Sequence, residues 1–239
     1  MDTEPRRLYR YYDLVMVLFV TVLLISNLLS SAKIIDLRVS LGPIPLAFDA
    51  GTLIFPISYI FGDILTEVYG YKRSRRVIWA GFGANALMAF FVWFAGILPG
   101  ESEWSQYAGQ PAYDAILGGI SGLIVASLVA YFMGEFSNSY VLAKMKVRTN
   151  GRWLWMRTIG STLVGEGVDT LVFMSIATLL GVFPLSIILS LIVTNYIIKV
   201  GIEVVMTPLT YRIINTLKAV ENEDYYDRYT DFNPFKLNV

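Results

Sequence analysis

The sequence predicts an all-α, multi-pass membrane protein with six transmembrane helices and with both termini in the cytoplasm. Hydrophobic residues make up 55% of the 239 residues and charged residues only 16%, whereas an ordinary soluble domain has about 25% charged residues. The mean hydropathy is +0.56. The apolar residues gather in six runs, each close to the roughly 20 residues that a helix needs to cross a bilayer. We therefore expect a protein of the plasma (cytoplasmic) membrane, surrounded by lipid.

Short linkers join the six runs, so we expect a single transmembrane domain over residues 1–239. The first run is too long for a cleavable signal peptide and is expected to be the first membrane helix. Residues 218–239 form an acidic, tyrosine-rich cytosolic tail, for which the composition predicts partial order at best. The expected helices cover residues 13–36, 49–70, 77–98, 114–137, 155–181 and 184–214.

Lysine and arginine are unevenly distributed over the linkers. The first linker contains only Arg38, and the third and fifth contain no Lys or Arg. Loops rich in Lys and Arg remain in the cytoplasm, which places both termini there. The basic residues of the four expected cytoplasmic segments are Arg6, Arg7, Arg10, Lys72, Arg73, Arg75, Arg76, Lys144, Lys146, Arg148, Arg152, Lys218 and Arg228.

The fifth expected helix carries two carboxylates within an apolar run. Glu166 and Asp169 are three residues apart and therefore lie on one side of the helix, about 60° apart. A carboxylate at the centre of a membrane helix costs about 2.5–3.5 kcal/mol on insertion scales. Lys199 on the sixth helix needs an anionic partner at the same depth, and either carboxylate can supply it. A ligand site and a structural ion pair with Lys199 or Lys33 both remain open.

Further polar residues lie at similar depth. Asn27 is near the middle of the first helix, Asn195 lies one turn before Lys199, and Asp63 is deep in the second helix. For Asn27, ligand contact and helix packing are equally supported, because an amide in hydrocarbon needs partners of either kind. The candidate binding residues, with aromatic surfaces chosen by depth, are Glu166, Asp169, Asn27, Lys199, Asn195, Asp63, Tyr59, Phe55 and Phe173.

A second group of charges is expected to form gating or structural ion pairs. Glu67 lies one turn from Asp63 and close to the basic cluster of the second linker. Lys33 lies near the outer surface, where it can also reach the interface by extending its side chain. Asp114 and Glu135 lie near the ends of the fourth helix and are expected to be solvated. The candidate ion-pair residues are Glu67, Arg75, Arg76, Arg157, Glu203 and Lys33.

The charges inside the expected helices do not balance. The five acids Asp63, Glu67, Glu166, Asp169 and Glu203 face the three bases Lys33, Arg157 and Lys199. An unpaired buried carboxylate takes up a proton or receives hydrogen bonds from a ligand. The surplus of acids predicts a ligand rich in N–H groups, a proton-coupled step, or both.

The composition argues against an enzyme. The chain has no histidine and no cysteine, so that serine–histidine proteolysis, an H-E-x-x-H zinc site and thiolate chemistry are excluded. The sequence G-E-G-V-D is one residue too long for the G-x-G-D of aspartyl membrane proteases, and no P-loop is present. We expect no metal and no cofactor. No basic face with interleaved aromatic residues predicts nucleic-acid binding.

The fourth expected helix carries small residues at four-residue spacing, which allows close approach of another helix. This pattern predicts tight packing and is compatible with a homodimer. The small residues are Gly118, Gly119, Gly122, Ala126, Ala130 and Gly134.

Five spaced motifs resemble the queuosine-precursor transporter family of the vitamin uptake transporter group. They are N-L-L-S-S-A-K, G-D-I-L-T-E-V-Y-G-Y-K-R-S-R-R, R-T-I-G-S-T-L-V-G-E-G-V-D-T, K-V-G-I-E-V-V-M-T-P and D-F-N-P-F. The resemblance covers nearly the whole chain. It implies import of a 7-deazaguanine queuosine precursor, 7-cyano-7-deazaguanine (preQ0) or its aminomethyl relative (preQ1), by secondary transport without an ATPase. It also implies a six-helix fold similar to the substrate-binding components of energy-coupling factor transporters.

The expected substrate suits the candidate residues. A carboxylate of Glu166 or Asp169 would accept hydrogen bonds from the N1–H and exocyclic amine of the guanine-like edge. Asn27, Asn195 or Lys199 would serve O6 and the ring nitrogens, and aromatic rings would stack on the base. An alternative is a substrate-binding component of an ATP-driven uptake complex for another heterocyclic nutrient. The sequence leaves the preferred precursor and proton coupling open.

Overall fold

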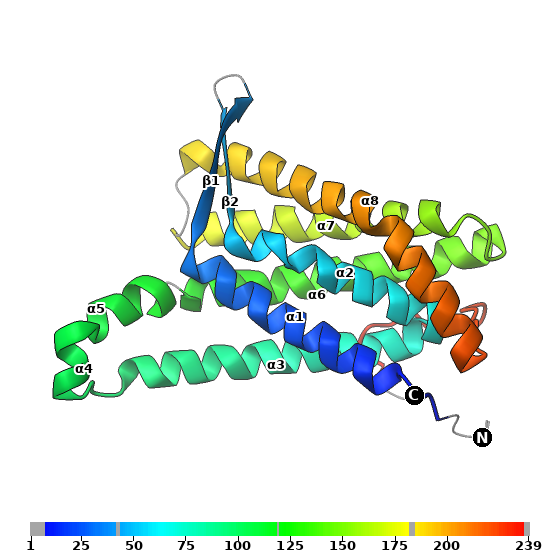
Figure 1. The fold of residues 1–239 in the computed structure, drawn as a ribbon, viewed down its shortest axis with the longest axis horizontal. Helices are drawn as coiled ribbons and strands as arrows, with labels where there is room; N and C mark the ends of the chain where they lie inside the picture. Colours follow the sequence, from blue (N-terminus) through cyan, green and yellow to red (C-terminus); the bar gives the residue numbers. More distant parts are fainter. Residues whose placement is uncertain (1–7, 42–43, 119, 182–184, 237–239) are drawn as a thin grey trace.

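The computed structural model describes residues 8–41, 44–118, 120–181 and 185–236. The chain is mostly helical, at 79%, and its long helices lie side by side as a bundle (Figure 1). Five helices of 21 to 34 residues build this bundle in the described part of the chain. They are α1 (Tyr12–Ala32), α3 (Tyr71–Ile97), α6 (Ile120–Thr149), α7 (Leu154–Leu179) and α8 (Ile188–Glu221).

Four of the described helices, α1, α3, α7 and α8, are long and apolar enough to cross a membrane. The chain is accordingly a multi-pass membrane protein. The second expected span consists of three consecutive helical pieces: η1 (Ala50–Leu53), α2 (Phe55–Ile64) and the π-helix η2 (Leu65–Tyr69). The fourth expected span corresponds to α6, which continues past residue 137 to Thr149. The short helix η4 (Leu185–Ile187) precedes α8.

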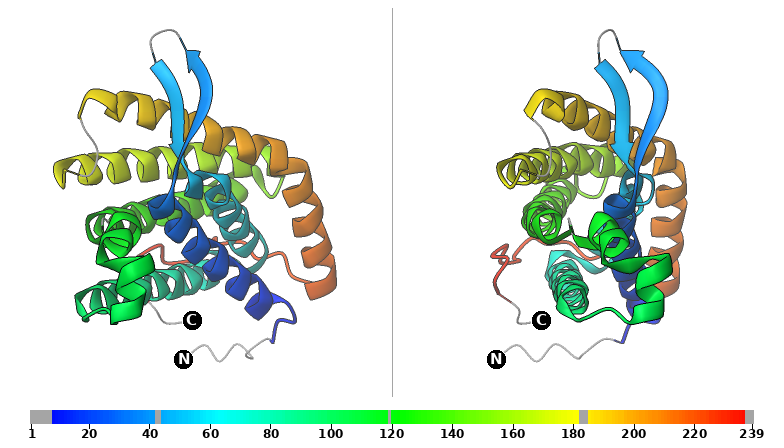
Figure 2. Two further views of the ribbon diagram at one scale, coloured as in Figure 1. Left: turned by 60° about the vertical axis from the view of Figure 1, so that its left-hand side comes forward. Right: turned by 90° about the vertical axis from the view of Figure 1, so that its left-hand side faces the viewer.

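A β-hairpin follows α1 and departs from the all-α expectation. Strand β1 (Ile34–Leu41) pairs antiparallel with β2 (Ile44–Asp49), with Ile34 opposite Asp49 and an irregularity between Asp36 and Ser40. Residues 34–36 were expected to continue the first helix. The sequence I-I-D-L-R-V-S-L instead alternates apolar and polar residues with the period of a strand. The outer part of the hairpin projects beyond the helices (Figures 1 and 2), while β2 packs against α8.

The third expected linker, residues 99–113, folds into the short helices α4 (Ser102–Tyr107) and α5 (Gly109–Tyr113), and the π-helical turn η3 (Asp114–Gly118) forms the start of the fourth expected helix. Glu101 caps α4, because its carboxylate accepts hydrogen bonds from the backbone N–H of Glu103 at 2.8 Å and of Trp104 at 2.9 Å. These backbone hydrogen bonds lower the pKa of Glu101 to about 2. The linker therefore forms a compact cap at one end of α3 (Figure 1).

The start of α1 and the end of α8 lie at one end of the bundle, opposite α4 and α5 (Figure 1); this end is called the end that holds the termini. The tail after α8 packs against the start of α3 and is more ordered than its composition predicts. Arg75 donates a hydrogen bond to the carbonyl of Asn233 at 2.6 Å, and the Trp79 indole donates one to the carbonyl of Pro234 at 2.8 Å. The tail is ordered by these long-range contacts, which satisfy polar groups of α3.

Helices α6 and α7 approach each other at glycine residues. A Cβ atom on Gly134 would lie 2.6 Å from the Tyr59 hydroxyl and 2.8 Å from Asp169 Cβ. On the same helix, Ala126 and Ala130 are buried within the chain. Part of the small-residue stripe therefore serves packing inside the chain and brings α7, with its carboxylates, close to α2.

Candidate functional site: a charged cavity between the helices

A cavity lies among α1, η1, α2, α6, α7 and α8. Of the nine candidate binding residues, the structure brings six to its wall: Asn27, Phe55, Asp169, Phe173, Asn195 and Lys199. The other three, Tyr59, Asp63 and Glu166, are fully buried behind it. The remaining lining residues are Ser30, Ser31, Asp49, Thr52, Ser127, Thr170 and Met174.

Lys199 is the central charge of the cavity wall. Its Nζ lies 2.8 Å from Asp169 Oδ2 and 3.1 Å from Glu166 Oε2. It also lies 4.2 Å from the centre of the Phe55 ring, a cation–π contact. The lysine residue is 8% exposed, whereas Glu166 is completely buried. One ammonium thus faces two carboxylates from the neighbouring helix.

Asp49 is a third carboxylate at this cavity, and the sequence analysis did not single it out. It caps η1, because it accepts hydrogen bonds from the Thr52 backbone N–H at 3.2 Å and the Thr52 hydroxyl at 2.9 Å. It also accepts a hydrogen bond from Ser30 on α1 and interacts electrostatically with Lys199. Asp is a preferred residue at the start of a helix, but the hairpin is what places Asp49 beside the cavity.

Asn195 connects α8 to this cap. Its Oδ1 lies 3.0 Å from the Thr52 hydroxyl, which also contacts Asp49. A hydroxyl group has a single proton, so Thr52 donates to Asp49 or to Asn195 at any one time. The Asn195 Nδ2 group has no hydrogen-bond partner among the residues that the structure describes, and it therefore retains a donor for a ligand.

Asn27 lines the cavity, but its amide is used within the chain. Its Nδ2 donates to Asn85 Oδ1 at 2.8 Å and to the Leu23 carbonyl at 3.1 Å. Its Oδ1 accepts a hydrogen bond from Ser127 at 2.6 Å. These bonds join α1, α3 and α6, so Asn27 acts as a helix cross-link on one wall of the cavity.

Several carboxylates lie in the protein behind the cavity. Asp63 Oδ1 accepts a hydrogen bond from Asn138 at 2.8 Å, while Asp63 Oδ2 has no partner. Both carboxylate oxygens of Glu203 are buried without a hydrogen-bond partner. Both carboxylate oxygens of Glu135 are likewise buried without a hydrogen-bond partner, and the residue is 0% exposed. The expectation that Glu135 is solvated was wrong, because α6 extends to Thr149 and places this residue in its middle.

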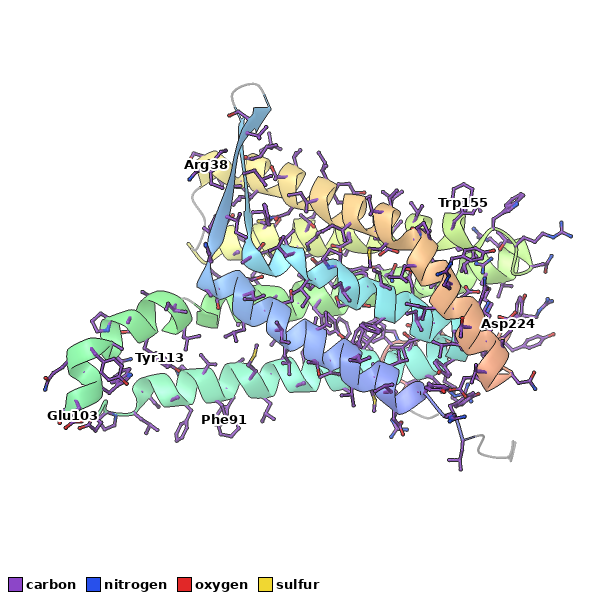
Figure 3. All side chains as sticks on the ribbon, viewed as in Figure 1. Arg38, Phe91, Glu103, Tyr113, Trp155 and Asp224 are labelled. Atoms are coloured by element: carbon purple, nitrogen blue, oxygen red, sulfur yellow. The ribbon has the colours of Figure 1, made fainter. Side chains whose placement is uncertain are left out.

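Glu67 forms an ion cluster at the end of the bundle that holds the termini. Its Oε1 lies 2.6 Å from Arg157 Nη2, 2.7 Å from Lys218 Nζ and 3.5 Å from Lys146 Nζ. These cations come from α7, α8 and α6. Asp224 of the tail lies 2.6 Å from Lys146 and 2.8 Å from Lys218. The label of Asp224 in Figure 3 marks this end.

The other candidate ion-pair residues lie apart from this cluster. Arg75 is buried and binds tail carbonyls, whereas Arg76 is exposed. Lys33 is exposed at the end of α1, and within the described ranges no ion pair involves it. Glu203 lies on α8 between Lys199 and the ion cluster. Sequence position alone could not distinguish these surroundings.

These features define a multi-pass membrane protein of the transporter class, with a charged cavity between its helices. The chain belongs to the family described as putative vitamin uptake transporter, whose model matches residues 49–213. That range includes the cavity residues from Asp49 to Lys199 but not Asn27. The description of the family is that of a transporter, not of an enzyme.

Similar proteins are named for one kind of substrate. The "Probable queuosine precursor transporter" of Bacillus subtilis (strain 168) is 28% identical over 162 residues, which is 67% of this chain and 69% of that protein. The "Queuosine precursor transporter" of Escherichia coli (strain K12) is 25% identical over 127 residues, or 53% of each chain. A Haemophilus influenzae relative named "Probable queuosine precursor transporter" is 24% identical over 53% of this chain and 50% of its own length. The match therefore spans only about half of these last two relatives. No solved structure matches the chain significantly.

Proposed function

We propose that the chain imports a 7-deazaguanine queuosine precursor, preQ0 or preQ1, across the plasma membrane. The observation that carries this proposal is the cavity wall on which Asp169, Lys199 and Asn195 converge, in a chain whose relatives are named for this substrate class. The proposal includes six membrane spans and cytoplasmic termini, with the basic linkers on the cytoplasmic side.

The chemistry of the cavity supports this substrate class. A guanine-like edge has an N1–H and an exocyclic amine, which one carboxylate can accept together. Asp169 supplies that carboxylate, held in place by Lys199 at 2.8 Å. The free Nδ2 group of Asn195 is a donor for O6. Phe173 lines the same cavity and offers an aromatic face for the flat ring.

The proposed transport is secondary, with a proton as the candidate coupling ion. The alternative is a substrate-binding component of an ATP-driven complex for another heterocyclic nutrient. Reconstitution of the purified chain alone in liposomes without ATP separates the two. Uptake of labelled preQ0 or preQ1 under these conditions supports the proposal, and uptake only after addition of an ATPase partner supports the alternative. A homodimer remains a prediction, which the mass of the purified protein in detergent tests.

The site is tested by replacing its carboxylates with their amides. We expect Glu166→Gln and Asp169→Asn to abolish precursor uptake while the protein still reaches the membrane. Glu103→Gln, a change at an exposed carboxylate of α4, is the matched control and should leave uptake unchanged. Normal uptake by Glu166→Gln and Asp169→Asn would contradict the assignment of the site.

A further inference from the structure

Two buried carboxylates lie between the cavity and the ion cluster, and substrate binding does not use them. Glu203 is one turn beyond Lys199 on α8, and Asp63 is one turn before Glu67. Both are 0% exposed. Both oxygens of Glu203, and Oδ2 of Asp63, are buried without a hydrogen-bond partner. Two carboxyl groups are therefore held in the protein interior with most of their hydrogen-bonding capacity unused.

The surroundings of this pair contain acids and few cations. Asp63 interacts electrostatically with Glu203, Glu135 and Glu67, and Glu203 interacts with Glu166. In the described ranges, no salt bridge joins Asp63 or Glu203 to a cation. A buried carboxylate without a counter-charge or donors is strongly disfavoured relative to the neutral acid. The neutral acids avoid this cost, and in that form Asp63 and Glu203 each hold a proton.

The helices packed against the pair define which charges face it. From α7 comes Glu166, from α6 comes Glu135 and from η2 comes Glu67. On β2, Asp49 acts on Lys199. The charged residue of α1, Asp13, is exposed at the far end of its helix. In the described parts of these helices, the buried cations already have carboxylate partners. Lys199 on α8 is shared by Asp169 and Glu166, and Arg157 on α7 is paired with Glu67.

We propose that Glu203 and Asp63 are a proton-carrying pair that connects the substrate cavity to the ion cluster around Glu67. A proton enters from the cavity at Asp169 or Glu166, passes to Glu203 and then to Asp63, and leaves through Glu67 at the end that holds the termini. Asp63 and Glu67 are separated by one helical turn, about 5–6 Å, and α2 packs against α8, the helix that carries Glu203. This inference rests on the proposed function, because it assigns the coupling step of that transport.

The position of the pair explains how a proton could accompany the substrate. Glu166 contacts Lys199 at 3.1 Å and interacts with Glu203. A ligand whose N–H groups bind Asp169 weakens the pull of Asp169 on the shared ammonium of Lys199. This changes the charge that Glu166 experiences and the tendency of Glu166, relative to Glu203, to hold a proton. Cavity occupancy and proton transfer are coupled through this one lysine.

The test uses the purified full chain in liposomes with labelled precursor and no ATP. With an acidic exterior, the wild type should accumulate precursor above the external concentration. Glu203→Gln and Asp63→Asn keep side-chain volume and a neutral group but cannot release a proton. Both variants should still exchange internal for external precursor and should reach only the external concentration, with or without the pH gradient.

Thr207→Val is the matched control, one turn beyond Glu203 on the same face of α8. It removes a hydroxyl and no titratable group, and it should accumulate precursor as the wild type does.

Two results would overturn the inference. One is concentrative, gradient-driven uptake by both Glu203→Gln and Asp63→Asn, and the other is a wild type that exchanges precursor but ignores the pH gradient. A wild type that neither binds nor exchanges precursor overturns the proposed function itself. The exchange assay therefore distinguishes failure of the proposed function from failure of the proton-carrying pair. Glu203→Asp retains a carboxyl group and should retain concentrative uptake, which distinguishes loss of the proton site from loss of fold.

Discussion

The ammonium of Lys199 lies 2.8 Å from the carboxylate of Asp169, across the interface of α8 and α7 at the wall of the cavity. Glu166 reaches the same ammonium at 3.1 Å from one turn away. The three side chains are almost completely buried. In the part of the chain that the structure describes, Lys199 is the one cation that pairs with both carboxylates. Its removal is expected to affect folding and transport together.

Lys199→Met should lower stability strongly, because it leaves two buried carboxylates without their cation. Removing one partner of a buried ion pair costs about 3–5 kcal/mol. We expect a clearly lower melting temperature in detergent and no precursor uptake. Lys33→Met changes an exposed lysine at the end of α1 and serves as the control, with no change in melting temperature. Equal melting temperatures for Lys199→Met and the wild type would show that the pair is not structural.

Glu67→Gln should destabilise the end of the bundle that holds the termini. Glu67 faces Arg157, Lys218 and Lys146, so its neutralisation leaves buried cations facing one another. We expect a loss of about 3–5 kcal/mol, measured by thermal unfolding of the purified protein. Arg76→Gln, at an exposed position of α3, should have no such effect. A stable Glu67→Gln protein would mean that Asp224 alone balances the cluster.

Gly134→Ala should disturb the contact between α6 and α7. The added Cβ would lie 2.6 Å from the Tyr59 hydroxyl and 3.1 Å from the Gly165 carbonyl, and overpacking of this kind costs about 1–3 kcal/mol. Gly201→Ala is the matched control on α8, because nothing lies within 4 Å of its Cβ position. The melting temperature should fall for the first variant and stay level or rise slightly for the second. The reverse order would contradict the close approach of the two helices.

Asp224 should make the tail contact sensitive to acid. Burial disfavours the charged form of this carboxyl, but hydrogen bonds from Lys146 and Lys218 outweigh it and lower the pKa of Asp224 below its ordinary value. A lowered pKa in the folded state stabilises the protein above the ordinary Asp pKa of about 3.9, and this contribution is lost as pH falls through the folded-state value.

The difference in melting temperature between the wild type and Asp224→Asn measures that contribution. We expect a constant advantage of the wild type near neutral pH, which shrinks as the pH falls below about 3.9. The side chain of Asp224 is 44% exposed, so the advantage is expected to be small because solvent screens the pair. A difference that does not depend on pH would show that the carboxylate does not bind the two lysines in solution.

The charged part of the site could be predicted from sequence because its energetic reason is local. Carboxylates in the middle of an apolar run need a partner, and Lys199 was the obvious cation at the same depth. The structure brings Glu166, Asp169 and Lys199 together at 2.8–3.1 Å. The depth of Glu135 was misjudged, since the apolar run ends before α6 does and the helix continues through a polar segment.

Other parts depend on contacts between distant segments. Asp49 reaches the cavity because the β-hairpin reverses the chain and returns it beside α1, where Ser30 binds the carboxylate. The alternating pattern of β1 indicates a strand, but it does not indicate what the strand positions. The order of the tail likewise comes from partners such as Arg75 and Trp79, more than 150 residues away, which composition cannot reveal.

Equilibrium binding of labelled preQ0 and preQ1 to the purified chain tests the central claim most directly. The account predicts saturable binding by the wild type and by Glu103→Gln. It also predicts that binding is lost in Asp169→Asn and weakened in Asn195→Ala, because these variants remove the acceptor and the donor for the guanine-like edge. Wild-type affinity in both cavity variants, or no saturable binding by a folded wild type, would contradict the assignment of this cavity as the site of precursor recognition.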